Sequence, residues 1–209
     1  MTLAVPAYFH PEREAADWDR LRAAGDRVSL VVVNPDSGPG AGDVAYGRAI
    51  RGLAGLVAGY VDTAYARRPL ADVLADVEAY RRLHGVDAVF LDQVTSSADH
   101  LVHYARLVAA VEGPVVLNPG VRPDPAYLGL ADVVVTFEGP WAAHCALEDP
   151  DPPGPASTWH LVHGVPEGEE DRTTRRASAL GATHTYVTGA TLPNPWGALP
   201  TWWPGRVAP

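Results

Sequence analysis

Residues 88–94 of this chain read Ala-Val-Phe-Leu-Asp-Gln-Val, and this stretch decides the fold class. Its apolar run has no polar alternation, which is typical of a strand buried on both faces of a parallel sheet. A helical pattern over residues 70–83, followed by Gly85, precedes it. The carboxyl ends of buried parallel strands are where α/β enzymes present catalytic groups. The sequence therefore predicts a buried strand that delivers Asp92 to the edge of a parallel sheet.

Seven more apolar runs flank this stretch, and helical patterns separate most of them. The predicted strands cover residues 3–9, 28–33, 56–61, 88–92, 114–117, 131–137, 159–162 and 184–187. The predicted helices cover residues 13–24, 43–53, 69–83, 97–110 and 167–180, with a helical turn near Tyr127. Eight strands that alternate with helices predict an α/β fold, a (β/α)8 TIM barrel. The alternative, an open doubly wound sheet, more often has fewer strands and a glycine-rich phosphate turn.

The length of the chain limits the size of this barrel. We expect residues 1–209 to form one domain, because no stretch has the composition of a linker between domains. A chain of 209 residues is short for a (β/α)8 barrel. We therefore expect a compact barrel with some shortened outer helices, notably those after the fifth and sixth strands.

Composition and charge exclude several classes of partner. The chain is 47% hydrophobic and 20% charged, as in soluble globular proteins. Its net charge of −9 disfavours nucleic acid, which is bound through basic surfaces. No apolar run approaches the roughly 20 residues of a membrane helix. The N-terminus lacks a signal-peptide pattern, so we expect a cytoplasmic protein, or a secreted one whose leader was removed. Cys145 stands alone and predicts no intrachain disulfide.

Polar residues gather at the ends of the predicted strands. In a barrel these ends meet at one mouth, where barrel enzymes keep their active sites. The candidate residues at this mouth are His10, Asn34, Tyr60, Asp62, Asp92, Gln93, Asn118, Glu138, His163 and Thr188, with Tyr8, Asn194 and Trp196 in the adjoining segments. Asn34 and Asn118 each precede a proline, so a purely structural role at a turn is an equal alternative for them.

Asp92 and Glu138 are the strongest catalytic candidates. Each follows an unbroken apolar strand, where an unpaired buried carboxylate is costly. Glycoside hydrolysis requires two carboxyl groups, one that donates a proton and one that acts as base or nucleophile. A structural salt bridge to an arginine is the alternative explanation for either acid. The histidines lack the short paired spacing of zinc sites, so we predict neither a metal nor another cofactor.

An ordered set of motifs identifies a family resemblance. The motifs are Val5-Pro6-Ala7-Tyr8, Val33-Asn34-Pro35, Gly59-Tyr60-Val61, Phe90-Leu91-Asp92, Leu117-Asn118-Pro119-Gly120, Thr136-Phe137-Glu138-Gly139, Leu161-Val162-His163-Gly164, Tyr186-Val187-Thr188 and Leu192-Pro193-Asn194-Pro195-Trp196. With them, nearly the whole chain resembles the spherulation-specific family 4, or spherulin-4-like, proteins. The resemblance implies a barrel related to glycoside hydrolases that cut α-1,4-linked galactosamine or N-acetylgalactosamine polymers. It also implies that Asp92 and Glu138 are the catalytic carboxylates.

Two positions depart from the family pattern. Gln93 stands where the family usually has a glutamate after the fourth strand, and Gly189 where an aspartate usually follows the eighth. An amide cannot exchange a proton at neutral pH as a carboxyl group can.

The departures leave alternatives to the first hypothesis, a glycoside hydrolase-like protein acting on an amino-sugar polysaccharide or a smaller glycoside. A non-hydrolytic carbohydrate-binding barrel is one, and a cytoplasmic biosynthetic enzyme that acts on a small molecule is another. Which acid plays which role, retention or inversion, and the oligomeric state are left open by the sequence.

Overall fold

The computed structural model describes residues 2–203, and its eight parallel strands close into a barrel. The strands are β1 (Thr2–Ala7), β2 (Val28–Val33), β3 (Leu56–Asp62), β4 (Ala88–Asp92), β5 (Val115–Leu117), β6 (Val133–Pro140), β7 (Ser157–His163) and β8 (His184–Val187). Each strand pairs with the next along the chain, and β8 pairs with β1. The predicted (β/α)8 TIM barrel is confirmed, and the open doubly wound sheet is excluded.

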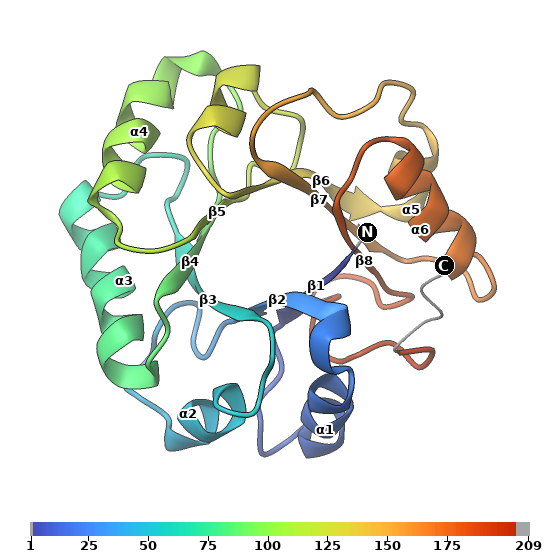
Figure 1. The fold of residues 1–209 in the computed structure, drawn as a ribbon, viewed down its shortest axis with the longest axis horizontal. Coiled ribbons are helices and arrows are strands. Elements are labelled where there is room, and N and C mark those ends of the chain that lie inside the picture. Colours follow the sequence, from blue (N-terminus) through green and yellow to red (C-terminus); the bar gives the residue numbers. More distant parts are fainter. Residues whose placement is uncertain (1, 204–209) are drawn as a thin grey trace.

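Helices surround the ring of strands, as Figure 1 shows. They are α1 (Ala15–Ala23), α2 (Val44–Ile50), α3 (Leu70–His84), α4 (Leu101–Ala110), α5 (Trp141–Cys145) and α6 (Glu170–Ala179), with 3-10 turns at Gly25–Arg27, Ala98–His100 and Pro125–Gly129. The outer layer is thin after β5 and β6, where a 3-10 turn and the five-residue α5 replace full helices. None of the helices in residues 2–203 is both long and apolar enough to cross a membrane.

The registers of β3 and β4 explain how Asp92 reaches the mouth. Tyr60 pairs with Phe90, and Asp62 pairs with Asp92. Phe90 packs on Trp159 of β7, with ring centroids 5.9 Å apart. Because β4 and β7 are not neighbours, this contact crosses the interior of the barrel. Side chains two residues apart on a strand share a face. Asp92 therefore also points into the barrel, one inward-facing position closer to the mouth than Phe90.

β6 is longer than the sequence predicts, and it carries a β-bulge. Val135 pairs with Trp159, whereas Phe137 pairs with His160, so one extra residue lies between these pairs. The inserted residue reverses the alternation of faces. Phe137 consequently packs outward against His144, and Glu138 turns inward. Glu138 thus lies within a strand rather than after one, and the predicted strand end at Phe137 was wrong.

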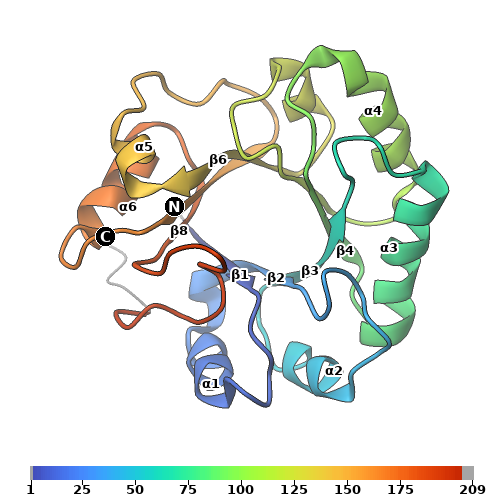
Figure 2. The same cartoon turned by 180° about the vertical axis from the view of Figure 1, so that it is seen from behind.

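The segment after β8 folds back beside β1 and α1, as the view from behind shows (Figure 2). The backbone N–H of Tyr8 donates to the carbonyl of Trp196 at 3.1 Å. The guanidinium of Arg20 donates to the carbonyl of Pro200 at 2.6 Å, and Asp17 accepts from the N–H of Leu199 at 2.9 Å. These bonds hold Trp196 over the mouth of the barrel.

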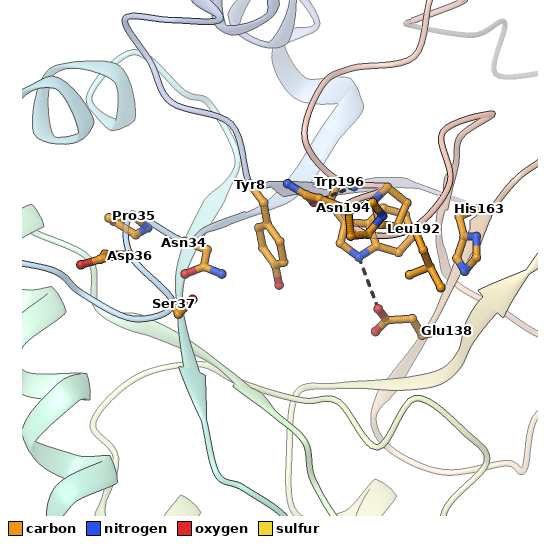
Figure 3. Close-up of a pocket in the computed structure, with 12 residues that line it drawn as sticks. Tyr8, Asn34, Pro35, Asp36, Ser37, Glu138, His163, Leu192, Asn194 and Trp196 are labelled. Carbon is orange, nitrogen blue, oxygen red and sulfur yellow. Dashed lines mark hydrogen bonds between the residues drawn. The ribbon is translucent and has the colours of Figure 1, made fainter.

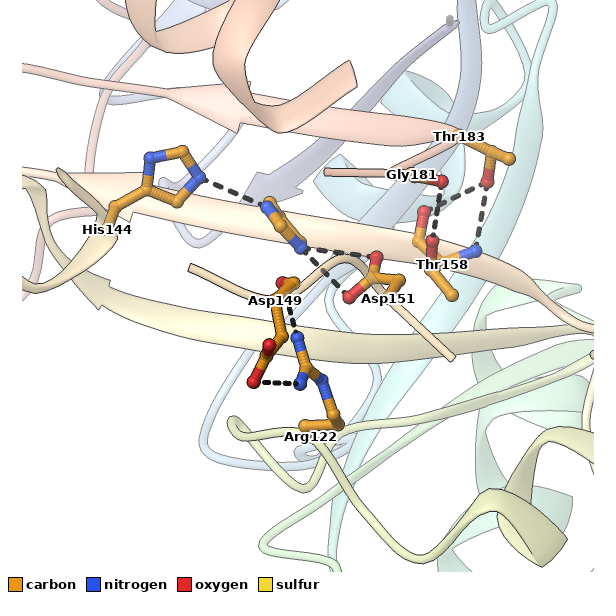
Figure 4. Close-up of polar contacts among 8 residues, drawn as sticks. Arg122, His144, Asp149, Asp151, Thr158, Gly181 and Thr183 are labelled. Atoms are coloured by element: carbon orange, nitrogen blue, oxygen red, sulfur yellow. Dashed lines mark hydrogen bonds and ion pairs between the residues drawn. The ribbon is translucent and has the colours of Figure 1, made fainter. Parts of the chain in front are cut away.

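A buried chain of ionisable groups lies outside the barrel, between β7 and α5 (Figure 4). His160 contacts Asp151 through Nε2, at 3.3 Å from Oδ1, and His144 through Nδ1, at 3.1 Å. His144 and His160 are 0% and 1% exposed. Burial, and then the positive charge of His160, lowers the pKa of His144 to about 4. Burial would raise the pKa of Asp151, but the bond and charge of His160 lower it overall.

This chain of groups predicts that the protein loses stability in acid. Between about pH 6.5 and 4 the folded state holds fewer protons at His144 than the unfolded chain, so the free energy of unfolding falls as the pH falls. A His144→Gln variant keeps a side-chain amide that can hydrogen-bond to Nδ1 of His160 but does not titrate. We expect it to lose about 1–2 kcal/mol less than the wild type between pH 7 and pH 5. Urea unfolding at both pH values measures this difference, and an equal loss in both proteins contradicts it. His100→Gln, at an exposed site, is the control.

Candidate active site

One side-chain amide joins the two candidate catalytic carboxylates. Asn118, which follows β5, lies between Asp92 on β4 and Glu138 on β6. Its Nδ2 donates to Oδ1 of Asp92 at 2.7 Å and to Oε2 of Glu138 at 2.6 Å. Since both bonds start from one nitrogen, these two carboxylate oxygens lie no more than about 5.3 Å apart. This upper limit is below the roughly 6.5–9.5 Å between the carboxyl groups of inverting glycosidases, so the spacing favours the retaining class, whose carboxyl groups are about 5–5.5 Å apart.

Further donors fix the orientation of each carboxylate. The hydroxyl of Tyr60 donates to Oδ2 of Asp92 at 2.8 Å, so both oxygens of this group accept a hydrogen bond. The indole Nε1 of Trp196 donates to Oε1 of Glu138 at 3.3 Å. Each carboxylate therefore accepts one hydrogen bond from a donor of its own and one from the amide of Asn118. These hydrogen bonds stabilise the ionised forms of both acids.

Burial changes the ionisation of both acids. Burial raises the pKa of Asp92, and the bonds from Tyr60 and Asn118 offset part of this rise. Burial also raises the pKa of Glu138, and the nearby charge of Asp92 adds to the increase. Burial and the charges of these two acids raise the pKa of Tyr8 well above its usual range, so its hydroxyl stays protonated. The site thus combines carboxyl groups that can hold a proton with phenol donors.

A cavity of about 540 Å³ opens beside Glu138 (Figure 3). Tyr8 points into the space between Asn34 and Glu138, and His163 lies beyond Glu138, on the side of the cavity away from Asn34. The other lining residues come from the loop after β2 and the segment after β8, namely Pro35, Asp36, Ser37, Leu192, Pro193, Asn194, Pro195 and Trp196. Of these wall residues, only Asn194 and Trp196 were predicted from the sequence to bind a ligand. Their proline-rich composition indicated a loop and carried no signal that the two loops face each other.

His163 presents an imidazole to this cavity. Its ring packs edge-on against Trp196, with centroids 6.1 Å apart. Burial lowers its pKa, and Nδ1 is buried without a partner among the described residues. A neutral imidazole beside the cavity can offer a hydrogen bond to a ligand without adding charge.

Gln93 contributes its backbone to the loop above β4. Its carbonyl accepts from the N–H of Tyr65 and from the hydroxyl of Thr63, each at 2.8 Å. Its φ of +50° is unusual for a residue with a side chain. In the described structure, no hydrogen bond is recorded for the side-chain amide of Gln93. The residue next to Asp92 therefore shapes the turn, while Asn118 and Tyr60 contact the carboxylate itself.

Three other predicted binding residues make local contacts away from the cavity walls. His10 Nε2 lies 2.8 Å from Oδ2 of Asp43, which caps α2. Asp62 accepts from the N–H of Ala64 at 2.6 Å, and the hydroxyl of Thr188 accepts from Ala190 at 3.1 Å. Asn34 and Asn194 likewise accept bonds within their own turns but also line the cavity.

The structure removes one alternative for the two acids. Within residues 2–203, every salt bridge involves other groups, and no arginine or histidine lies within 4.0 Å of the carboxylates of Asp92 or Glu138. In the described part of the chain, both carboxyl groups accept hydrogen bonds from neutral donors only and have no positively charged partner. A structural salt bridge therefore does not explain their burial.

The family model of spherulation-specific family 4 matches residues 2–208. The chain belongs to this family. One curated relative in the family, Spherulin-4 of Physarum polycephalum, is 35% identical over 149 residues, and the match covers 65% of this chain and 44% of that protein. The match thus spans less than half the length of this relative. The predicted family membership is confirmed.

A solved structure gives the same fold. The crystal structure of Aspergillus clavatus Sph3 in complex with GalNAc is similar to this chain with a TM-score of 0.78 and 26% sequence identity. The similarity covers 97% of this chain and 94% of that one. The family model supports membership of family 4, and the similar solved structure supports the eight-stranded barrel.

Proposed function

We propose that this family 4 protein is a glycoside hydrolase that acts on a polysaccharide containing N-acetylgalactosamine or galactosamine. The observation that carries the proposal is the pair Asp92 and Glu138, joined by one amide at a spacing below that of inverting glycosidases, with Glu138 lining an open cavity. The GalNAc complex of the similar Sph3 barrel supports the choice of sugar.

The surroundings of the two acids support distinct roles. Both carboxylates accept a hydrogen bond on each oxygen, but the bond from Tyr60 to Asp92 is 2.8 Å, whereas the bond from Trp196 to Glu138 is 3.3 Å. The shorter bond favours Asp92 as the ionised nucleophile. Glu138 borders the cavity, and its raised pKa suits a group that must start the reaction protonated. In the first step Asp92 attacks the anomeric carbon while Glu138 protonates the leaving oxygen. In the second step Glu138 takes a proton from water, which displaces Asp92 and releases a sugar of retained configuration.

The direct test is hydrolysis of acetylated and de-N-acetylated galactosamine oligomers. NMR of the fresh products reports the anomeric configuration, and we expect retention. Calorimetric binding of the same oligomers without any product would instead support the non-hydrolytic binding barrel.

The binding barrel is favoured by one specific feature, the space around Gly189. A Cβ placed there would lie 3.2 Å from the ring of Trp202 and 3.2 Å from the carbonyl of Val165. Such contacts are tighter than ordinary packing, so an aspartate at 189 would require both Trp202 and the backbone at Val165 to shift by a few tenths of an ångström. If the family's aspartate is needed for turnover, this protein binds without hydrolysis.

The Gln93→Glu variant distinguishes a hydrolase from a barrel that only binds carbohydrate. Because Asp92 and Glu138 form the working pair in our proposal, we expect the Gln93→Glu variant to hydrolyse the oligomers within about tenfold of the wild-type rate. Initial rates at several pH values check this expectation. An inactive wild type together with an active Gln93→Glu variant would assign the missing chemistry to position 93 and overturn the proposed pair.

A further inference from the structure

Asn118 is placed to act on the two carboxylates rather than on a sugar. Both hydrogens of its amide are used, one by Asp92 and one by Glu138. Its Oδ1 accepts from the N–H of Gly120 at 2.9 Å. The residue is 5% exposed. Little of Asn118 is left for a ligand, so the expected substrate contact gives way to a role inside the site.

The backbone around Asn118 is tied to both strands that carry the acids. Its N–H donates to the carbonyl of Leu91 at 2.8 Å, and its carbonyl accepts from Val94 at 3.0 Å, so it is bonded on either side of Asp92. The N–H of Glu138 donates to the carbonyl of Gly120 at 2.8 Å. Gly120 has a φ of +68°, which favours glycine. The turn that begins at Asn118 therefore holds the amide in a fixed position between β4 and β6.

We propose that Asn118 is a positioning residue, a spacer whose amide sets the distance between Asp92 and Glu138 and prevents these two groups from sharing a proton directly. The expected effect of Asn118 on catalysis rests on the proposed function. The effect of its amide on the ionisation of the two carboxyl groups does not depend on any substrate. Two neighbouring carboxyl groups without a donor between them tend to share one proton and titrate as a pair. An amide between them donates to both and lets one be ionised while the other is protonated.

The first test is Asn118→Asp, which replaces the donor nitrogen with oxygen. The new side chain keeps an oxygen for the N–H of Gly120, so the turn is preserved. We expect kcat near pH 7 to fall about 10²–10³-fold, because two hydrogen bonds to charged groups are lost, with KM within about threefold of wild type. We also expect partial recovery of kcat in acid, where the new carboxyl group gains a proton and can donate again. A pH profile with the shape of the wild type would overturn the proposal.

The second test does not depend on activity. 13C NMR of the side-chain carboxyl carbons follows the titration of Asp92 and Glu138 in the wild type, Asn118→Ser and Asn118→Ala. We expect the two carboxyl groups of Asn118→Ala to titrate as a coupled pair, in two steps that lie further apart than in the wild type and with the upper step at higher pH. Asn118→Ser, which has one donor, should lie between. Titration curves that coincide in all three folded proteins would refute the spacer.

The two tests distinguish the inference from the proposed function. If the wild type hydrolyses no oligomer, the proposed function fails, and the NMR titration still decides the role of Asn118. If hydrolysis occurs but the titrations coincide, the spacer alone fails. Circular dichroism of each variant confirms folding, and Asn118→Ser, which retains a hydroxyl donor in a smaller side chain, replaces Asn118→Asp if the third buried acid prevents folding.

Discussion

The Glu138→Gln and Asp92→Asn variants are each expected to lose about 10³-fold or more of the wild-type hydrolysis rate on galactosamine oligomers. Glutamine at 138 cannot protonate the leaving oxygen, and asparagine at 92 cannot form the ester with the anomeric carbon. Initial rates with matched enzyme concentrations measure the loss. Full activity in either variant would exclude the proposed pair.

An activated substrate separates the two roles. An aryl glycoside with a dinitrophenyl leaving group departs without protonation, so its first step does not require a general acid. Glu138→Gln should therefore recover most of its first-step rate on this substrate, whereas Asp92→Asn should not. The reverse result would exchange the roles of the two acids.

Stability measurements control for damage to the fold. Asparagine at 92 can accept from Asn118 with its oxygen and donate to the hydroxyl of Tyr60 with its amide. Because burial raises the pKa of Asp92, its ionised form lowers stability above that pKa, and the neutral variant should gain about 1 kcal/mol at pH 7. Glutamine at 138 faces two donors, Asn118 and Trp196, and can accept from one with its oxygen. We expect no gain there.

Trp159→Ala is expected to lower the free energy of unfolding by about 3–5 kcal/mol, the largest stability effect that we predict. Trp159 is 0% exposed, and its ring packs across the barrel on Phe90. Removing it leaves a cavity beneath Asp92, because Phe90 and Asp92 share one face of β4. Urea unfolding at pH 7 measures the loss.

A matched variant isolates the packing of this ring. Trp159→Phe retains an aromatic ring and removes an indole N–H that is buried without a partner among the described residues. The loss of a buried unsatisfied donor offsets part of the lost volume, so we expect a decrease of about 1–2 kcal/mol. Equal losses in the alanine and phenylalanine variants would show that the barrel interior relaxes around this position.

The strands of this protein were largely predictable, and the physical reason is burial. Strands covered on both faces need a continuous apolar run, which a sequence displays directly. The predicted bounds of β2 and β8 agree with the structure. Helix ends were less accurate, because exposed turns tolerate many residues. α6 begins at Glu170, three residues later than predicted. The five-residue α5 agrees with the shortened helix expected after the sixth strand, but its bounds were not predicted because it is too short to show a helical period.

The sequence by itself determined the closed alternation of strands and helices, the family, and two acids near the carboxyl ends of β4 and β6. Tertiary structure decided which way those acids point and what lies between them. The bulge before Phe137 turns Glu138 inward, and a side-chain period of two makes that single inserted residue decisive. The predicted barrel already places β5 between β4 and β6, but only the tertiary structure shows that the Asn118 amide points at both acids and donates to each. Side-chain direction and distance depend on packing, which the spacing of residues along the chain does not encode.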